Sequence, residues 1–138
     1  MKKIIFLFSF VYLFGFTSID ATKANILKLH KENIPIVDIR TPSEWKSTGT
    51  IPFAKKIMFF TPRGQINQAF LYELKQNGIN KNSKFAVICR TGHRSKVAAK
   101  ILEDNGYKNV INLKNGMFNL FKDLLKNLKE QWWKKKQK

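Results

Sequence analysis

The sequence predicts an α/β fold in which helices cover both faces of a mostly parallel sheet. Short apolar runs alternate along the chain with stretches of helical apolar spacing. A length of 138 residues suits one domain with a sizeable core, and 43% hydrophobic with 25% charged residues is typical of globular proteins. Strands that alternate with helices form parallel sheets, because each helix returns the chain to the same edge.

The first elements have clear local signals. Residues 22–33 place isoleucine and leucine among lysines at helical spacing, which predicts a short amphipathic helix. Residues 34–39 (IPIVDI) form a brief apolar run typical of a buried strand. Residues 41–44 (TPSE) combine a capping box with proline at the first helical position, which predicts a helix start.

The rest of the chain continues the alternation. Apolar runs predict strands, and apolar residues three and four positions apart predict helices. The expected strands cover residues 56–60, 85–88 and 109–113, and the expected helices cover residues 65–76, 94–105 and 118–132. Gly106 fits the position just after a helix end.

The N-terminus has the pattern of an export signal. Lys2 and Lys3 precede residues 4–16, an uncharged run of 13 residues. That length matches a signal-peptide core of about 7–15 residues and falls short of the roughly 20 that span a bilayer. Residues 17–21 supply a cleavage region that ends at Ala21. We therefore predict a periplasmic protein, with an uncleaved inner-membrane anchor and a buried helix as alternatives.

This interpretation divides the chain into three parts. The predicted parts are a signal peptide over residues 1–21, a domain over residues 22–131 and a basic C-terminal tail over residues 132–138. The chain has one cysteine, so an exported form cannot make an internal disulfide, and its thiol is a candidate reactive group. We expect a monomer.

The charge is strongly positive, with 26 Lys+Arg against 9 Asp+Glu and a net charge of +17. Such an excess favours anionic partners. A lysine-rich composition bias, with abundant Asn, Ile and Phe, explains the bulk of it equally simply. Export and the lack of an aromatic, basic readout pattern argue against nucleic acid. Trp132 and Trp133 before the terminal lysines suit a membrane interface, although Trp132 also suits core packing.

The candidate chemistry follows the strand over residues 85–88. Residues 89–95 (CRTGHRS) place two of the four arginines of the chain beside its only cysteine, Cys89. A short loop between a strand and a helix N-terminus points backbone N–H groups at one spot and so forms an anion cradle. Gly92 permits the turn. Such a cradle favours the thiolate, which is the nucleophilic form of cysteine.

Four segments resemble signatures of the rhodanese family, and the resemblance covers about residues 26–121. They are residues 37–45 (VDIRTPSEW), 48–54 (TGTIPFA), 89–95 (CRTGHRS) and 110–117 (VINLKNGM). The resemblance implies a rhodanese-like fold and a sulfurtransferase. In this family a cysteine accepts sulfane sulfur from a donor such as thiosulfate or a persulfide. It then passes that sulfur to cyanide or a thiol, and no cofactor is needed.

The resemblance also implies a role for each site residue. Cys89 would be the catalytic sulfur carrier. The substrate cradle would consist of Arg90, Thr91, Gly92, His93 and Arg94, and the supporting residues would be Asp38, Arg40, Glu44 and Ser95. The chain departs from the family pattern at Thr50, Phe53 and Asn115, which are structural positions in the family, and asparagine suits a left-handed turn.

Several alternatives stay open. A phosphatase loop also carries a cysteine and an arginine, but with five residues between them, whereas four separate Cys89 from Arg94. A persulfide carrier without turnover needs the same residues as an enzyme. Cys89 alone reads as a small buried hydrophobe, His93 as a loop hydrogen-bonder and Asp38 as a capping residue. A metal site is not expected, because His30, His93 and Cys89 lack ligand spacing.

Overall fold

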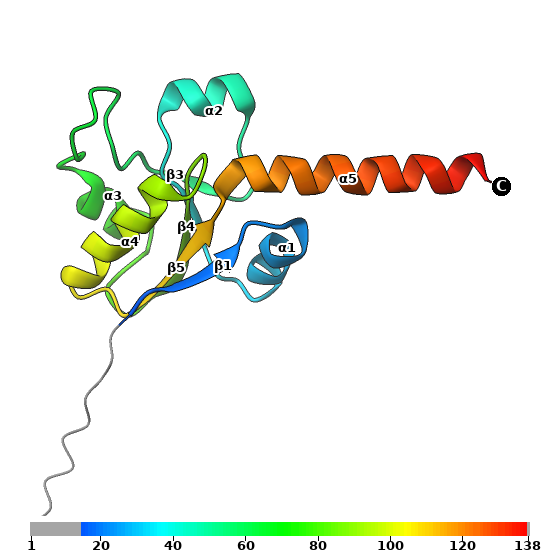
Figure 1. The fold of residues 1–138 in the computed structure, drawn as a ribbon. Helices are drawn as coiled ribbons and strands as arrows, with labels where there is room; N and C mark the ends of the chain where they lie inside the picture. Colours follow the sequence, from blue (N-terminus) through cyan, green and yellow to red (C-terminus); the bar gives the residue numbers. More distant parts are fainter. Residues whose placement is uncertain (1–14, 138) are drawn as a thin grey trace, which may run out of the picture.

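A computed structural model describes residues 15–137 and contains a five-stranded sheet between two layers of helices (Figure 1). The strand order is β1-β5-β4-β2-β3, and all neighbouring strands are parallel. The strands are β1 (Thr17–Asp20), β2 (Ile36–Asp38), β3 (Lys55–Lys56), β4 (Lys84–Ile88) and β5 (Asn109–Lys114). The helices are α1 (Lys23–Lys31), α2 (Pro42–Thr48), α3 (Phe70–Gln76), α4 (His93–Asp104) and α5 (Gly116–Lys136). The predicted α/β fold is confirmed.

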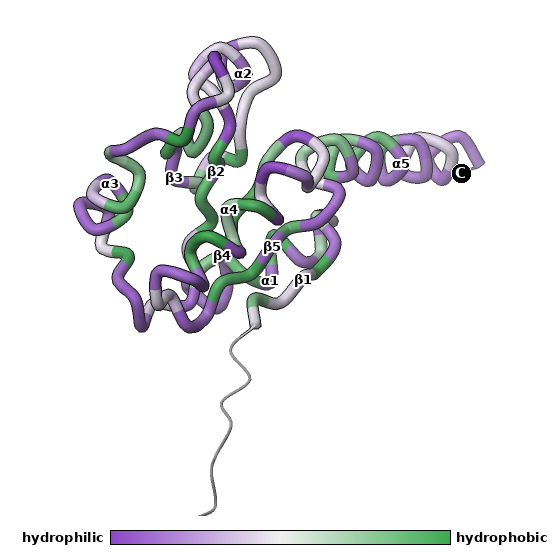
Figure 2. Tube along the Cα trace, turned by 60° about the vertical axis from the view of Figure 1, so that its left-hand side comes forward, coloured by the Kyte–Doolittle hydropathy of each residue, from purple (hydrophilic) through white to green (hydrophobic). Residues whose placement is uncertain are grey.

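Two apolar clusters hold the layers together, one on each face of the sheet. Helices α1 and α5 pack Ile26, Leu29, Met117 and Leu120 against one face. Helices α3 and α4 pack their apolar side chains, among them Phe70 and Leu102, against the other face. In Figure 2 the central strands are therefore hydrophobic along most of their length, while the helices alternate between hydrophobic and hydrophilic positions.

The sheet begins earlier than the predicted domain boundary at residue 22. Strand β1 lies inside the segment assigned to a signal peptide, and it pairs with β5 along its whole length. The backbone N–H of buried Ala21 donates to the carbonyl of Lys114 at 3.1 Å. This strand has only four residues, TSID, and it contains no apolar run from which it could have been predicted. The signal core over residues 4–16 lies almost entirely outside the described residues, so the export signal itself stays a prediction.

The region between β2 and β4 is less regular than predicted. Strand β3 has only two residues, and Phe60 makes an isolated antiparallel bridge to Ile66. Helix α3 begins at Phe70 rather than at residue 65. The side chain of Asn67 accounts for the delay, because its oxygen accepts the N–H of Ala69 and holds a turn there.

Helix α5 is longer than predicted and includes most of the segment assigned to a tail. It continues through Trp132 and Trp133 to Lys136. Lysine is a good helix former, and positive charge at a helix C-terminus interacts favourably with the helix dipole. The outer part of α5 extends away from the domain (Figure 1). Within the described chain, no helix combines the length and apolarity that crossing a membrane requires.

Candidate functional site

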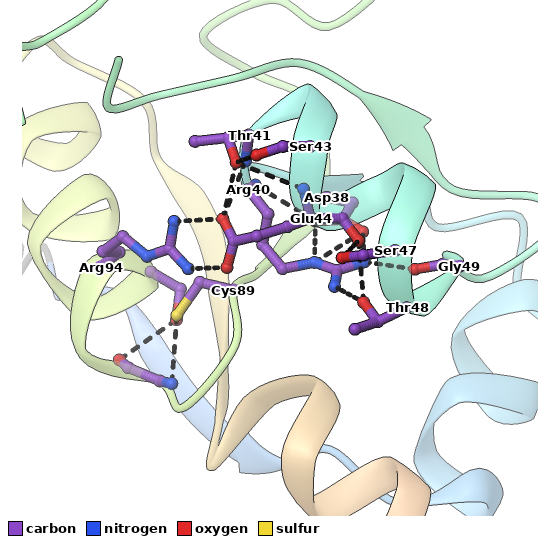
Figure 3. Close-up of polar contacts among 12 residues, drawn as sticks. Asp38, Arg40, Thr41, Ser43, Glu44, Ser47, Thr48, Gly49, Cys89 and Arg94 are labelled. Atoms are coloured by element: carbon purple, nitrogen blue, oxygen red, sulfur yellow. Dashed lines mark hydrogen bonds and ion pairs between the residues drawn. The ribbon is translucent and has the colours of Figure 1, made fainter. Parts of the chain in front are cut away.

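Cys89 is the first residue after β4, at the carboxyl edge of the sheet where ligands bind in open α/β folds. Its side chain is fully buried. The sulfur accepts the backbone N–H of Gly92 at 3.1 Å and donates to the hydroxyl of Ser95 at 3.4 Å (Figure 3). The Ser95 hydroxyl donates in turn to the Gly92 carbonyl at 3.2 Å. The loop thus closes around the sulfur with one backbone donor and one hydroxyl in contact with it.

Glycine is required at position 92 for two reasons. Gly92 has φ of +94°, a conformation that other residues rarely adopt. A Cβ there would also lie 2.7 Å from the backbone nitrogen of Asn115. Asn115 itself has φ of +62°, which confirms the expectation that asparagine supplies the left-handed turn between β5 and α5.

The start of α5 lies against the same loop. The N–H of Met117 donates to the Cys89 carbonyl at 2.9 Å, and the N–H of Phe118 donates to the Arg90 carbonyl at 3.0 Å. A side chain at Gly116 would collide with both of these carbonyls. The first turn of α5 therefore fixes the backbone that carries the sulfur.

Arg94 does not point at the sulfur but forms an ion pair with Glu44 of α2. Its two terminal nitrogens donate to the two carboxylate oxygens at 2.8 and 2.6 Å (Figure 3). This guanidinium, together with the N–H and hydroxyl of Thr41, lowers the pKa of Glu44 to about 2. Glu44 in turn raises the pKa of Arg94, to which Cys89 and Asp38 also contribute. Both members of the pair are therefore charged at neutral pH.

Asp38 and Arg40 form a second, buried ion pair under the site. The guanidinium binds both Asp38 oxygens, the closest at 2.6 Å, and Arg40 is only 1% exposed. The remaining Arg40 donors bind the Thr48 hydroxyl at 2.7 Å and the Gly49 carbonyl at 2.6 Å. The Thr50 hydroxyl donates to Asp38 at 2.7 Å. Both charges are therefore well provided with hydrogen bonds, as buried charges must be.

These two ion pairs hold helix α2 in place. None of its seven residues is buried, so apolar packing does little to position it. Glu44 ties its first turn to α4 through Arg94, while Arg40 holds its last residue, Thr48. Polar contacts with two arginines thus position the helix that borders the site.

A hollow of about 360 Å³ opens beside the loop. Exposed Arg90 lines it together with parts of α2 and the first turns of α5, including Phe118 and Phe121. Thr91 and His93 are exposed on the same loop. Cationic and aromatic side chains, together with the paired carboxylate of Glu44, therefore line the surface next to the Cys89 loop.

The structure sorts the predicted site residues into three groups. Cys89, Gly92 and Ser95 contact one another, Arg94 forms an ion pair with Glu44, and Asp38 forms an ion pair with Arg40. Two features were not predicted from the sequence: the partners of Arg40, namely Thr48 and Gly49, and the aromatic rim, Phe118 and Phe121. The segment over residues 48–54 was a signal for the first pair. Helical spacing predicted only that the phenylalanines lie on a helix, and their exposure in the structure reveals the rim.

No group of three His, Cys, Asp or Glu side chains in residues 15–137 is arranged to hold a metal ion. The site contains a thiol, backbone donors and hydroxyls, together with two guanidinium groups that are each paired with a carboxylate.

Comparison with known proteins agrees with this geometry. The chain matches the family described as Rhodanese-like domain over residues 22–123. It is 35% identical over 104 residues to uncharacterized protein RP600 of Rickettsia prowazekii, covering 72% of this chain and 81% of that one. It is 33% identical over 86 residues to a protein of Allochromatium vinosum named sulfurtransferase, covering 62% of this chain and 70% of that one.

A solved structure shares the fold. The crystal structure of a rhodanese-like domain protein from Staphylococcus aureus superposes with a TM-score of 0.55 at 31% identity, covering 74% of this chain and 88% of that one. The match to the family, the relatives and the sulfur held between β4 and α4 lead to one conclusion: this chain belongs to the rhodanese-like domain family.

Proposed function

We propose that this protein is a sulfurtransferase that carries sulfur on Cys89. The observation that supports this most directly is the position of the Cys89 sulfur, 3.1 Å from the Gly92 nitrogen at the start of α4. A helix N-terminus stabilises negative charge, so it favours a persulfide anion at this place. The Allochromatium relative, a protein named sulfurtransferase, supports the same chemistry.

The reaction has two displacement steps. The Cys89 thiolate attacks the outer sulfur of a donor such as thiosulfate, the S–S bond of the donor breaks, and sulfite leaves with the bonding electrons. An acceptor such as cyanide or a thiol then attacks the outer sulfur of the persulfide, and the Cys89 thiolate leaves. No external oxidant or reductant enters either step.

The surroundings of the loop suit a small anionic substrate. Arg90 is exposed beside the hollow of about 360 Å³, so its guanidinium is positioned to attract an incoming anion. Arg94 is held by Glu44 and acts by positioning the loop. This arrangement argues against a phosphatase, in which the loop arginine would have to bind the phosphate ester.

A second function, a persulfide carrier without turnover, is favoured by the complete burial of Cys89. A buried sulfur is protected from small oxidants and thiols, and a carrier would expose it by opening the loop for its partner. Carrier and enzyme share the first displacement step and differ in how fast the second one follows.

Intact mass spectrometry tests the proposal. Incubation with thiosulfate should add one sulfur atom to the protein, cyanide should remove it, and Cys89→Ser should show neither change. Repeated formation of thiocyanate supports the enzyme, whereas release of one equivalent supports the carrier. Persistent transfer by Cys89→Ser, or no added sulfur in the wild type with thiosulfate or a polysulfide, would contradict the assignment.

A further inference from the structure

Helix α5 carries a row of exposed apolar side chains, which we call the α5 stripe. The stripe consists of Phe118, Phe121, Leu125, Leu128 and Trp132. At 100° per residue they fall within an arc of about 80° on the helix surface. Each of them is between 38% and 61% exposed. Single exposed apolar residues are ordinary, but an aligned row of five marks an interaction surface.

The polar part of α5 is strongly basic. The helix has two acidic residues, Asp123 and Glu130, and both lie on the side opposite the stripe. Asp123 already accepts the backbone N–H of Lys23 at 2.7 Å. The lysines of α5 are Lys122, Lys126, Lys129, Lys134, Lys135 and Lys136. The first three run along one border of the stripe, so apolar surface and positive charge are presented side by side.

Tryptophan concentrates at the outer end of the helix. Trp132 belongs to the stripe, Trp133 follows it, and both are exposed. The Lys136 ammonium lies 4.1 Å from the centre of the Trp132 ring. Tryptophan beside lysine is characteristic of the boundary between lipid headgroups and acyl chains, where the ring is half-buried and the charge meets phosphate.

A second copy of this chain fits the stripe poorly. The stripe has the spacing of a coiled-coil seam, in which charged residues on both flanks select the partner. One flank holds Lys122, Lys129 and Lys136. The other flank, with Met117, Leu124 and Gln131, has no acidic residue. Two paired helices would therefore place lysine against lysine or against uncharged side chains, and the charge calls for an anionic partner.

We propose that α5 lies on an anionic lipid surface, with the stripe buried at the level of the headgroups and the lysines bound to phosphate. The stripe begins at Phe118, whose backbone N–H donates a hydrogen bond to the Arg90 carbonyl of the Cys89 loop at 3.0 Å. Docking would therefore bring the entrance of the site to the membrane surface. The proposal stands on α5 alone and does not depend on sulfur transfer.

Tryptophan fluorescence of the full-length protein tests this inference. The chain has three tryptophans, so Trp45→Phe leaves two, both on α5. Vesicles of phosphatidylcholine with phosphatidylglycerol should shift the emission to the blue, and lipids brominated in the acyl chain should quench it. Pure phosphatidylcholine or high salt should weaken both effects.

Variants in the same background separate the two components. Leu125→Ser with Leu128→Ser should abolish the shift, with Leu71→Ser and Val97→Ser as exposed apolar controls on α3 and α4. Changing Lys122, Lys126 and Lys129 to glutamine should weaken binding roughly a hundredfold. The same change at Lys75, Lys81 and Lys108, exposed lysines outside α5, should have little effect.

Four outcomes would overturn the proposal. If neither kind of vesicle changes the tryptophan emission, the stripe does not bind lipid, and a protein would be its partner. Equal loss in the two lysine variants would mean attraction by overall charge alone. Vesicle sedimentation without a tryptophan shift would assign binding to another part of the chain. If sedimentation of the protein without vesicles shows dimers, and the variant with Leu125→Ser and Leu128→Ser does not form them, a second copy of the chain would be the occupant of the stripe.

Discussion

Arg94 and Glu44, fifty positions apart in the chain, are joined by two parallel hydrogen bonds that tie the first turn of α4 to the first turn of α2. Glu44 also completes the capping box of α2 by accepting the N–H of Thr41 at 3.0 Å. One carboxylate therefore both starts a helix and anchors it beside the loop that holds Cys89. A substitution of Glu44 therefore tests both roles of this carboxylate.

Glu44→Gln should destabilise the protein by about 1 kcal/mol at neutral pH, a value discounted for the partial exposure of the pair. The pKa of Glu44 is about 2 in the folded protein, against 4.5 as its ordinary value. Its contribution is thus fully present above about pH 4.5 and is lost as the pH falls toward 2. Urea unfolding of both proteins across this range should show the stability difference shrinking on acidification. As a control, Asp104→Asn breaks the exposed pair with Lys100 and should cost less than about 0.5 kcal/mol. A difference that grows in acid would contradict this account.

Arg40→Ala should destabilise the fold far more, by about 3–5 kcal/mol, because it leaves the Asp38 carboxylate buried without its partner. The variant also removes the donors to Thr48 and Gly49, so α2 should become susceptible to proteolysis before the rest of the domain. Thermal unfolding and limited proteolysis measure the two effects. Arg63→Ala, at an exposed arginine, is the matched control and should change neither. Equal behaviour of the two variants would mean that the buried pair has no structural role.

Gly92→Ala should abolish sulfur loading and reduce stability. The new Cβ meets the Asn115 backbone, and alanine is strained at a φ of +94°. Gly64→Ala separates these causes, because Gly64 also has positive φ but has no atom within 4 Å of the added Cβ. We expect about 1–2 kcal/mol for Gly64→Ala with normal sulfur loading. Gly92→Ala should cost about 1–3 kcal/mol more because of overpacking. Normal loading by Gly92→Ala would show that the loop tolerates a shift of the turn before α5.

The mature protein should retain Thr17. Cleavage after Ala21 would remove β1 and its pairing with β5, together with the buried Ala21 side chain. N-terminal sequencing of protein isolated from its native host should therefore find an end at or before residue 17. We also expect a chain that starts at Thr22 to unfold at lower temperature than one that starts at Phe16. A native N-terminus at Thr22 would contradict this prediction.

Much of the fold could be predicted from local sequence patterns. The capping box at Thr41 predicted the start of α2, and the apolar run before Cys89 predicted β4. Strand β1 could not be predicted in this way, because its stability comes from pairing with β5 almost a hundred positions later rather than from its own residues. Strand β3 ends after two residues, although the apolar run that predicted it continues to Phe60.

The site was predictable in its position and less so in its contacts. The spacing of Cys89, Gly92 and Arg94 identified the loop, because a strand followed by a glycine turn and a helix has one local geometry. The orientation of Arg94 toward Glu44 depends on where α2 packs, which no local pattern specifies. For the same reason helical spacing alone could not show that Phe118 is exposed beside the site.

The pairing of β1 with β5 has a consequence for biosynthesis. Strand β1 is at the edge of the sheet, and the strand beside it is the last one synthesised. While the ribosome is still producing the segment before Asn109, the chain has no partner for β1 and cannot complete its sheet. Long-range pairing of this kind delays folding until most of the polypeptide has emerged. A nascent chain that stays unfolded for so long is the form that an export channel accepts, so the late closure of the sheet keeps the predicted secretion route open.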